Sequence, residues 1–441
     1  MKKYRLGEIA EVIGGVTFNK ADITTSGIRI LRGGNIQNGE ICLKEDDVYL
    51  PHIYKDNKNT ILEGDTILVA STGSVEVLGK AATAFSSLGE VQIGAFLRII
   101  RPKKTRYAAL ISAHLQSSQF REYIQKQAKG TSINNIRNEY LINFLLYVPN
   151  EDSLVDFSAF YHTIQRKIAL NRAINHNLEA MAKQLYDYWF VQFDFPDKDG
   201  KPYKSSGGEM VWSEKLKREV PEGWFVSNIC RIADILSGGT PQKVVSEYWE
   251  NGVIPFFGPT DYRGDIFQIE TIDHITQNGL NHCASSLFEE GTIIITARGS
   301  IGKLVILGKP MAMNQSCYAL QSKGGEYEYL YFLTIQLIEY LKTKGSGSVF
   351  KSIIASDIEN SFLCIANAET ITRFCTTTNP LLQRIKQSTL EISELTKQRD
   401  KLLPLLMNGQ VKVGVECSRL NYDLSKHSSR AQSCGLLPLL R

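Results

Sequence analysis

The chain has 441 residues, of which 43% are hydrophobic and 22% are charged, and its net charge is +4. This length allows two or three domains, and the composition is ordinary for a soluble globular protein. No apolar run approaches the roughly 20 residues that cross a bilayer, and the N-terminus lacks the apolar core of a signal peptide, so we expect a cytoplasmic protein.

Eight cysteines are scattered along the chain without a C-x-x-C pair. This pattern suggests neither a zinc site nor a disulfide framework, and we expect reduced thiols. His274 and the His282–Cys283 pair have the composition of metal ligands but no second pair of ligands, so we expect no metal. The weak positive charge permits a nucleic-acid partner without requiring one.

Taken in chain order, the elements occur twice, at an offset of about 220 residues. Each half opens with an amphipathic stretch ending in Gly-Gly, continues through a short apolar stretch, a β-branched strand with a Gly-Ser turn, and a helix of period 3.6 with a Lys-Gly-hydroxyl loop, and closes with a strand. The paired segments are 6–20 with 226–243, 27–36 with 252–261, 63–81 with 289–307, and 108–136 with 329–353. Each half therefore predicts an α+β head.

A heptad pattern follows each head and predicts a long helix. In the first helix, position a holds Phe157, Ile164, Asn171, Leu178 and Leu185, and position d holds Phe160, Lys167, Ile174, Met181 and Tyr188. In the second, position a holds Ile371, Ile385, Ile392 and Leu406, and position d holds Phe374, Leu381, Leu395 and Leu402. We expect this helix to start at Pro380, with Asn379 as its cap, because proline is costly inside a helix.

The two helices should pack together as an antiparallel coiled coil that separates the heads. The predicted domains are two globular heads (1–150 and 225–367), a central helix (151–191), a connecting segment on the surface (192–224), a C-terminal helix (368–413) and a poorly ordered tail (414–441).

The segment TARGSIGKL, residues 296–304, resembles a phosphate-binding loop of the form G-x-x-x-x-G-K-[ST]. Ala297 replaces the first glycine and Leu304 replaces the hydroxyl residue, so two of the four fixed positions fail. We expect no ATP site here. Because a similar Gly-Ser turn recurs in the first half, the segment is better interpreted as part of the repeat.

Two related heads on one chain suit a split DNA target, since bipartite sites are normally read by symmetric dimers with half-sites about 34 Å apart. Four segments are specific in combination: GDTILVASTGS (64–74), QLYDYWFVQFDFPDKDGKPYKSSGGEMVWSEKLKREVPEGW (184–224), GGTPQKVVSEYWENGVIPFF (238–257) and LLPLLMNGQVKV (402–413). In this duplicated order, over residues 1–413, the chain resembles the DNA-specificity subunit of type I restriction–modification enzymes.

The resemblance implies a non-catalytic subunit that binds double-stranded DNA, with each head reading one half of an asymmetric bipartite site. It also implies that the coiled coil sets the spacer and docks two methyltransferase subunits, through which restriction–translocase subunits join. S-adenosylmethionine, ATP and Mg would then be bound by the partner subunits only. The alternatives are a specificity subunit whose partner fuses nuclease and methyltransferase, an ATP-using enzyme in its own right, and a coiled-coil scaffold without a DNA role.

Candidate DNA contacts are polar and basic residues in the repeated loops, because arginine, asparagine and glutamine can read base edges while lysine and hydroxyl groups suit phosphates. They are Thr17, Lys20, Arg32, Asn35, Thr72, Ser74, Lys129, Thr131, Ser132, Asn134, Asn135, Thr240, Gln242, Lys243, Arg298, Ser300, Lys303, Lys344, Ser346, Ser348 and Lys351. The alternative interpretation is plain turns and helix caps. In the first half, Glu76 and Val77 stand near the positions that correspond to Gly302 and Lys303.

Two features of the first helix have a structural and a functional interpretation. Asn171 at position a is expected to be buried and to fix the helix register. Tyr186, Tyr188, Trp189 and Phe190 form an aromatic cluster at the end of the helix. Core packing is the simpler interpretation, and a docking site for the methyltransferase is the alternative, because aromatic residues dominate interface hot spots.

Overall fold

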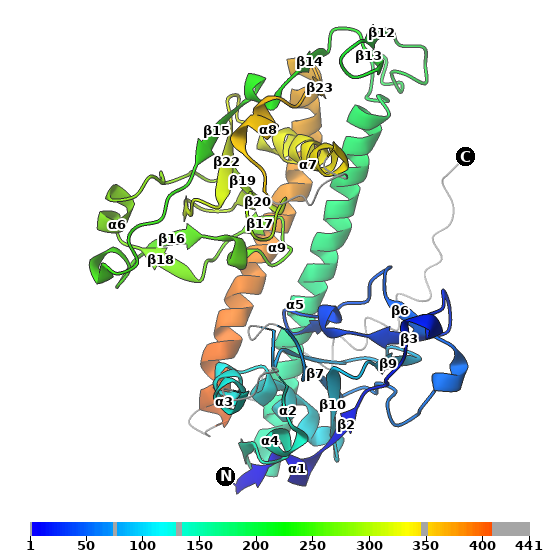
Figure 1. Ribbon diagram of the computed structural model, residues 1–441, viewed down its shortest axis with the longest axis vertical. Helices are drawn as coiled ribbons and strands as arrows, with labels where there is room; N and C mark the ends of the chain where they lie inside the picture. Colours follow the sequence, from blue (N-terminus) through cyan, green and yellow to red (C-terminus); the bar gives the residue numbers. More distant parts are fainter. Residues whose placement is uncertain (1, 74–76, 129–134, 345–351, 408–441) are drawn as a thin grey trace. The chain divides into compact units, whose positions relative to one another are not determined.

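A computed structural model describes residues 2–73, 77–128, 135–344 and 352–407. The chain divides into two compact units, each with an α+β head and parts of two long helices (Figure 1). Unit 1 contains the described residues up to Ala169 together with those from Leu395 onward, and unit 2 runs from Leu170 to Glu394. None of the described helices is both long enough and apolar enough to span a membrane.

The head of unit 1, called the first head, is built around a four-stranded antiparallel sheet of order β2-β10-β7-β8. Every residue of β7 is buried, as expected for a central strand rich in β-branched residues. The strands of this head are β1 (Lys2–Arg5), β2 (Ala10–Gly14), β3 (Ile28–Leu31), β4 (Ile36–Gln37), β5 (Glu40–Ile41), β6 (Val48–Leu50), β7 (Thr66–Val69), β8 (Ala81–Thr83), β9 (Val91–Ile93), β10 (Leu97–Pro102) and β11 (Leu145–Val148).

Smaller sheets and short helices complete the first head. Strands β6, β3 and β9 form a three-stranded sheet, β4 pairs with β5, and β1 pairs with β11, so the start of the head is joined to its end. The helices are α1 (Leu6–Ile9), α2 (Ala108–Leu115), α3 (Ser118–Ala128) and α4 (Asn138–Ile142). Helix α2 is buried along its whole length and contributes to the same core as Leu68 and Ile100 of the main sheet.

The head of unit 2, called the second head, repeats this plan with a five-stranded sheet of order β15-β22-β19-β20-β17 and a three-stranded sheet β18-β16-β21. Its strands are β14 (Phe225–Ser227), β15 (Ala233–Ser237), β16 (Ile254–Phe257), β17 (Phe267–Gln268), β18 (Asp273–Ile275), β19 (Ile293–Thr296), β20 (Leu304–Leu307), β21 (Ala312–Met313), β22 (Cys317–Ser322) and β23 (Leu363–Ile365). Its helices are α6 (Gln277–Asn281), α7 (Tyr327–Lys344) and α8 (Ala355–Glu359).

Strand pairing confirms the internal repeat. The order β2-β10-β7-β8 of the first head recurs as β15-β22-β19-β20, and β6-β3-β9 recurs as β18-β16-β21. The register matches as well: Val69 faces Leu97 in the first head, and Thr296 faces Cys317 in the second. Both three-stranded sheets contain one antiparallel and one parallel pair.

The long helices α5 (Glu151–Tyr186) and α9 (Ala368–Met407) pair antiparallel (Figure 1). Within unit 2, the Asn171 amide donates to Glu391 at 2.8 Å and the Asn175 amide donates to the Thr389 hydroxyl at 3.2 Å. Within unit 1, Arg399 donates to the Gln165 carbonyl at 3.3 Å. Rising numbers on α5 therefore meet falling numbers on α9, as expected.

The predicted heptad positions are half right. The a positions are buried or partly buried, and Asn171 is 4% exposed as expected. The predicted d row of α5 is wrong, because Lys167 and Met181 are exposed and the second buried row lies one residue later. That row is Tyr161, Ile168, Asn175, Ala182 and Trp189. Because Asn175 and Ala182 are not large apolar residues, the hydrophobic pattern of the sequence does not reveal this buried row. The same shift occurs on α9, where Leu382, Thr389 and Leu403 are buried.

The predicted start of the second long helix is also wrong. Helix α9 begins at Ala368 and continues through Pro380, so Asn379 is not its cap. Proline inside a helix costs about 3 kcal/mol, but its ring is exposed here, and the turns on either side are anchored in the core by Phe374 and Leu382, both fully buried. Packing of the two flanking turns outweighs the local cost.

The connecting segment 192–224 is more than a surface linker. It forms a hairpin of β12 (Met210–Ser213) and β13 (Arg218–Pro221). Phe193, Phe195 and Trp224 are buried in the core of unit 2, where Phe195 and Trp224 stack with ring centroids 5.0 Å apart. The many glycine and lysine residues of the segment had suggested a surface linker, although the segment also contains these aromatic residues.

His114 gives unit 1 a pH-dependent stability. Its ring is buried near Phe144 and its Nε2 atom has no hydrogen-bond partner, and burial lowers its pKa from 6.5 to about 4. The unfolded chain therefore binds the proton more readily, so the stabilisation is fully present above pH 6.5 and is lost as the pH falls toward 4. The expected loss in the free energy of unfolding is about 3 kcal/mol.

Denaturant unfolding of the intact chain and of a His114→Leu variant at pH 7 and pH 5 measures this contribution. The wild type should lose more stability than the variant on acidification. An equal loss in both proteins would contradict the assignment.

Candidate nucleic-acid interface

In each head, a loop leaves the buried central strand at an alanine and is fixed by one carbonyl from a neighbouring turn. The N–H groups of Ala70 and Ser71 donate to the Phe96 carbonyl at 2.9 and 3.1 Å. In the second head, the N–H groups of Ala297 and Arg298 donate to the Ser316 carbonyl at 2.7 and 3.3 Å. These bonds define equivalent positions in the two heads independently of sequence similarity.

The far ends of the two loops also correspond. The N–H of Gly79 donates to the Val69 carbonyl at 2.9 Å, and that of Gly302 donates to the Thr296 carbonyl at 2.8 Å. Both glycines have positive φ angles, 76° and 73°, which favour glycine. Lys80 and Lys303 follow them and accept equivalent strand bonds.

Glu76 and Val77 are therefore not the counterparts of Gly302 and Lys303. The correct counterparts are Gly79 and Lys80. The sequence does not align them directly, because eight residues lie between Ala70 and Gly79 but only four lie between Ala297 and Gly302. The dipeptide Gly-Lys in LGKA and IGKL was the available signal. Thr72 and the exposed Arg298, Ser300 and Lys303 lie in or next to these loops.

The loop of the second head is not a phosphate-binding loop. It joins β19 to β20, which pair antiparallel, so it is a hairpin. A Walker loop instead leads into a helix N-terminus, whose N–H groups hold the phosphates. The Lys303 ammonium lies 5.4 Å from the centroid of the Tyr262 ring and is exposed.

A second predicted segment meets the same alanines. The N–H of Ile136 donates to the Ala70 carbonyl at 2.7 Å, and the N–H of Ile353 donates to the Ala297 carbonyl at 3.0 Å. Asn135, which is exposed, forms a β-bridge with Ser71. Lys344 is the last residue of α7. The other predicted residues near these segments lie outside the described residues: Ser74, Lys129, Thr131, Ser132, Asn134, Ser346, Ser348 and Lys351.

A third segment passes beside the turn that carries Phe96 or Ser316. The N–H of Val16 donates to the Ile93 carbonyl at 2.8 Å, and that of Gly239 donates to the Met313 carbonyl at 3.1 Å. Thr17 and Thr240 follow directly, and the Thr240 hydroxyl bonds the side chain of Gln315. Gln315 is exposed, and no motif in the sequence indicated it.

The basic residues after these threonines are exposed on short turns. Lys20 begins a 3-10 turn, Lys20–Asp22. In the second head, the Trp249 indole N–H donates to the Gln242 carbonyl at 3.2 Å, and the Lys243 ammonium lies 6.0 Å from the indole centroid. Trp249 thereby fixes the backbone that carries both predicted residues.

Asn35 is a structural residue, which corrects its prediction as a DNA contact. Its side chain is 2% exposed; it accepts from the Arg32 N–H at 2.8 Å and donates to Asp47 at 2.6 Å. Asp261 has the same role in the second head, where it accepts from the Gly258 N–H at 2.8 Å. Arg32 itself is exposed.

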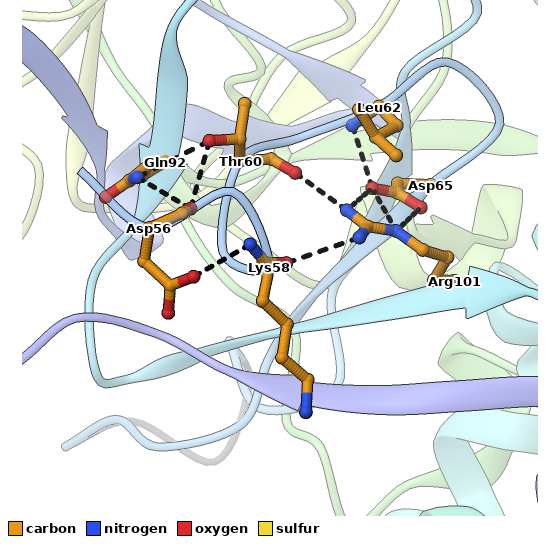
Figure 2. Close-up of polar contacts among 7 residues, drawn as sticks. All are labelled: Asp56, Lys58, Thr60, Leu62, Asp65, Gln92 and Arg101. Carbon is orange, nitrogen blue, oxygen red and sulfur yellow. Dashed lines mark hydrogen bonds and ion pairs between the residues drawn. The ribbon is translucent and has the colours of Figure 1, made fainter.

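In the first head, an ion pair joins β10, the strand after the Phe96 turn, to Asp65, the residue just before β7 (Figure 2). Arg101 on β10 donates to both oxygens of Asp65, at 3.0 and 2.7 Å, and to the Thr60 carbonyl at 2.7 Å. Gln92 on β9 donates to the Asp56 carbonyl at 2.9 Å. By strand register, Thr292 and Gln321 occupy the positions of Asp65 and Arg101 in the second head, so this ion pair belongs to the first head alone.

Three of the four aromatic residues proposed for docking are buried. Tyr186, Trp189 and Phe190 are at most 5% exposed, and Phe190 lies 4.9 Å from Phe374, centroid to centroid. The simpler interpretation, core packing, applies to these three, because a buried ring offers no surface to a partner. Only Tyr188, 36% exposed, remains available.

An exposed apolar stripe on the same helix was missed. Leu170 and Met181 of α5 are 59% and 55% exposed, and Tyr188 follows in a π turn, Asp187–Val191. Their spacings of eleven and seven residues are close to three and two helical turns, so they share one face. The shift of the buried seam by one residue is what places Met181 outside.

Among the described residues, no group of three or more potential metal ligands converges. His282 bonds the Asn278 carbonyl at 2.8 Å and stacks on Tyr248, with centroids 5.1 Å apart. Its role is local packing.

The structure thus defines a protein with two related heads, each with loops gathered around one alanine, carried by an antiparallel helix pair. The family model described as the type I restriction modification DNA specificity domain matches residues 1–180 and 221–369, and the chain belongs to this family.

Two relatives with assigned roles agree with this family. The chain is 22% identical over 419 residues to the specificity subunit of the type I restriction enzyme MjaIX from Methanocaldococcus jannaschii, covering 93% of each protein. It is 22% identical over 366 residues to the HindI specificity subunit of Haemophilus influenzae, covering 72% of this chain and 76% of that protein. A solved S subunit from M. genitalium is 16% identical, with a TM-score of 0.49 over 92% of this chain and 95% of that one.

Adjacent glycines test the packing that places the Thr17 segment. A Cβ on Gly15 would lie 2.2 Å from the Gly94 carbonyl oxygen, whereas a Cβ on Gly14 would meet nothing within 4 Å. Gly15→Ala should therefore displace the Phe96 turn and cost about 1–3 kcal/mol of unfolding free energy, while Gly14→Ala should stay within about 0.5 kcal/mol of wild type. Denaturant unfolding measures both, and equal stabilities of the two variants would contradict the predicted clash.

Proposed function

We propose that each head binds one half of a bipartite DNA sequence through the loops gathered around Ala70 and Ala297. The observation that carries this proposal is the repetition of the same backbone bonds in both heads, with exposed polar and basic residues on the loops they fix. Membership of the specificity-domain family supports DNA as the ligand. The relatives named above are specificity subunits of restriction enzymes, and we assign this chain the same role.

The two halves of the DNA site should differ. The first head carries the longer loop with Lys80, and the second carries the shorter loop with Arg298 and, beside it, Gln315. Arginine suits guanine and glutamine suits adenine in the major groove, while lysine suits phosphate. The backbone hydrogen bonds that both heads share, here called the backbone frame, therefore present two chemically different surfaces.

We assign the chain a non-catalytic role, with S-adenosylmethionine, ATP and Mg bound by partner subunits. Two methyltransferase subunits dock on the helix pair, restriction–translocase subunits join through them, and the helices set the spacer between half-sites. For docking, we favour the stripe of Leu170, Met181 and Tyr188, because exposed apolar side chains on one helix face suit a protein partner. The alternative, a partner that fuses nuclease and methyltransferase, could dock on the same stripe.

Adenine methylation mapping tests the DNA role. DNA from cells that express the methyltransferase with this chain should carry a split, asymmetric motif that is absent without the chain. Exchange of residues 226–353 for another head should change only one half of the motif. An active, assembled complex without any motif would reject the proposal in favour of a scaffold.

Arg298→Ala should relax recognition at one position of the second half. The loss of a bidentate guanine contact costs about 1–3 kcal/mol at that position, and the first half should be unaffected. Lys198→Ala, which removes a charge from an exposed residue of the connecting segment, is the control. Binding to duplexes with single-base changes measures the effect; an unchanged preference at every second-half position would exclude Arg298 as a base contact.

Met181→Asp should weaken assembly with the methyltransferase by at least about tenfold, equivalent to about 1.4 kcal/mol, because it places a charge in an apolar contact. Met181→Leu keeps the surface apolar and should assemble normally. Titration of the partner onto the labelled chain distinguishes them. Equal affinities would place the docking surface elsewhere.

A further inference from the structure

One large apolar side chain lies exposed at the centre of the first head's candidate interface. Phe96 is 67% exposed, although Leu97, the next residue, is fully buried. A phenylalanine left in water forgoes the favourable free energy of burying its ring. Its position in the turn between β9 and β10 places it among the loops already described, because its own carbonyl holds the N–H groups of Ala70 and Ser71.

The turn that carries Phe96 is rigidly held. Arg98 donates to the carbonyls on either side of it, those of Ala95 at 2.8 Å and Leu97 at 2.7 Å, and to the Asn138 side chain at 3.0 Å. The N–H of Gly94 donates to the Leu31 carbonyl at 2.9 Å. A side chain on such a fixed backbone can contact a ligand with little further ordering cost.

The second head differs at this position. Ser316, whose carbonyl makes the equivalent bonds, is only partly exposed, and Tyr318 replaces Arg98 by strand register. The shared frame therefore does not require an exposed aromatic residue here. Phe96 is a feature of the first head's own surface, as expected for a residue that determines specificity.

We propose that Phe96 is a base-contacting residue of the first head and that it packs against the 5-methyl group of a thymine in the major groove. Among the bases, only thymine presents a methyl group there, and phenylalanine is one of the side chains that contact it. This inference rests on the proposed function, since it assumes that the first head binds DNA. It adds an apolar contact to a surface otherwise predicted from polar and basic residues.

Deoxyuridine is the direct probe, because it pairs like thymine but lacks the methyl group. Duplexes that carry the mapped site, with each first-half thymine replaced in turn by deoxyuridine, are titrated with the assembled complex. At one position the wild type should bind about fourfold more weakly, the effect of losing one buried methyl group. Phe96→Ala should bind the thymine duplex more weakly to a similar degree and should no longer distinguish thymine from deoxyuridine there.

Four comparisons make the result specific. Phe96→Leu should recover part of the discrimination, and Ile53→Ala, which truncates another exposed apolar residue of the first head, should leave it unchanged. The dependence of affinity on salt should be the same for Phe96→Ala and wild type, because no phosphate contact is lost. Thermal unfolding should also be unchanged, since the side chain is exposed.

Two kinds of failure are distinguishable. If the wild-type complex has no bipartite motif, the DNA role of the heads fails. If the motif is present but the first half lacks thymine, or deoxyuridine is tolerated at every position, or Phe96→Ala retains full discrimination, only the inference about Phe96 is overturned.

Discussion

The candidate interface of each head depends on one buried backbone junction. Ala70 and Ala297 are at most 2% exposed, and each donates its N–H to one distant chain segment and accepts from another. A buried amide without a partner costs as much as a lost hydrogen bond, so these three segments must stay together for the head to fold. Folding itself thereby assembles loops that are far apart in sequence, and their side chains remain free to vary.

The helix pair is specified by polar as well as apolar contacts. Asn171 and Asn175 meet Glu391 and Thr389 at positions where apolar residues would pack more strongly. Apolar side chains tolerate a slip along the seam, whereas a hydrogen-bonded pair is satisfied in one register only. The pairs thus give up some stability for a defined alignment.

Repetition was predictable from the sequence because it leaves matching letters at several places, such as Gly-Gly before Thr17 and Thr240. The alignment of the loops was not predictable, because the two loops differ in length and Gly79 therefore does not align with Gly302 in the sequence. Asn35 was misinterpreted because nothing local shows that Asp47 occupies its amide. The buried a positions of α5 were predictable because most of them hold large apolar residues. The second buried row was not, because it contains Asn175 and Ala182, which are buried by the facing helix.

The same separation of frame and surface explains why the two heads can differ so much. The bonds that fix the loops are made by backbone atoms, and these are common to both heads. The residues that differ, Phe96 against Ser316 and the Asp65–Arg101 pair against Thr292 and Gln321, lie on or behind that frame. A substitution on the exposed side changes what a head contacts without removing a bond that folds it. Two halves of a DNA site can therefore be read by one architecture, and each half can change independently of the other.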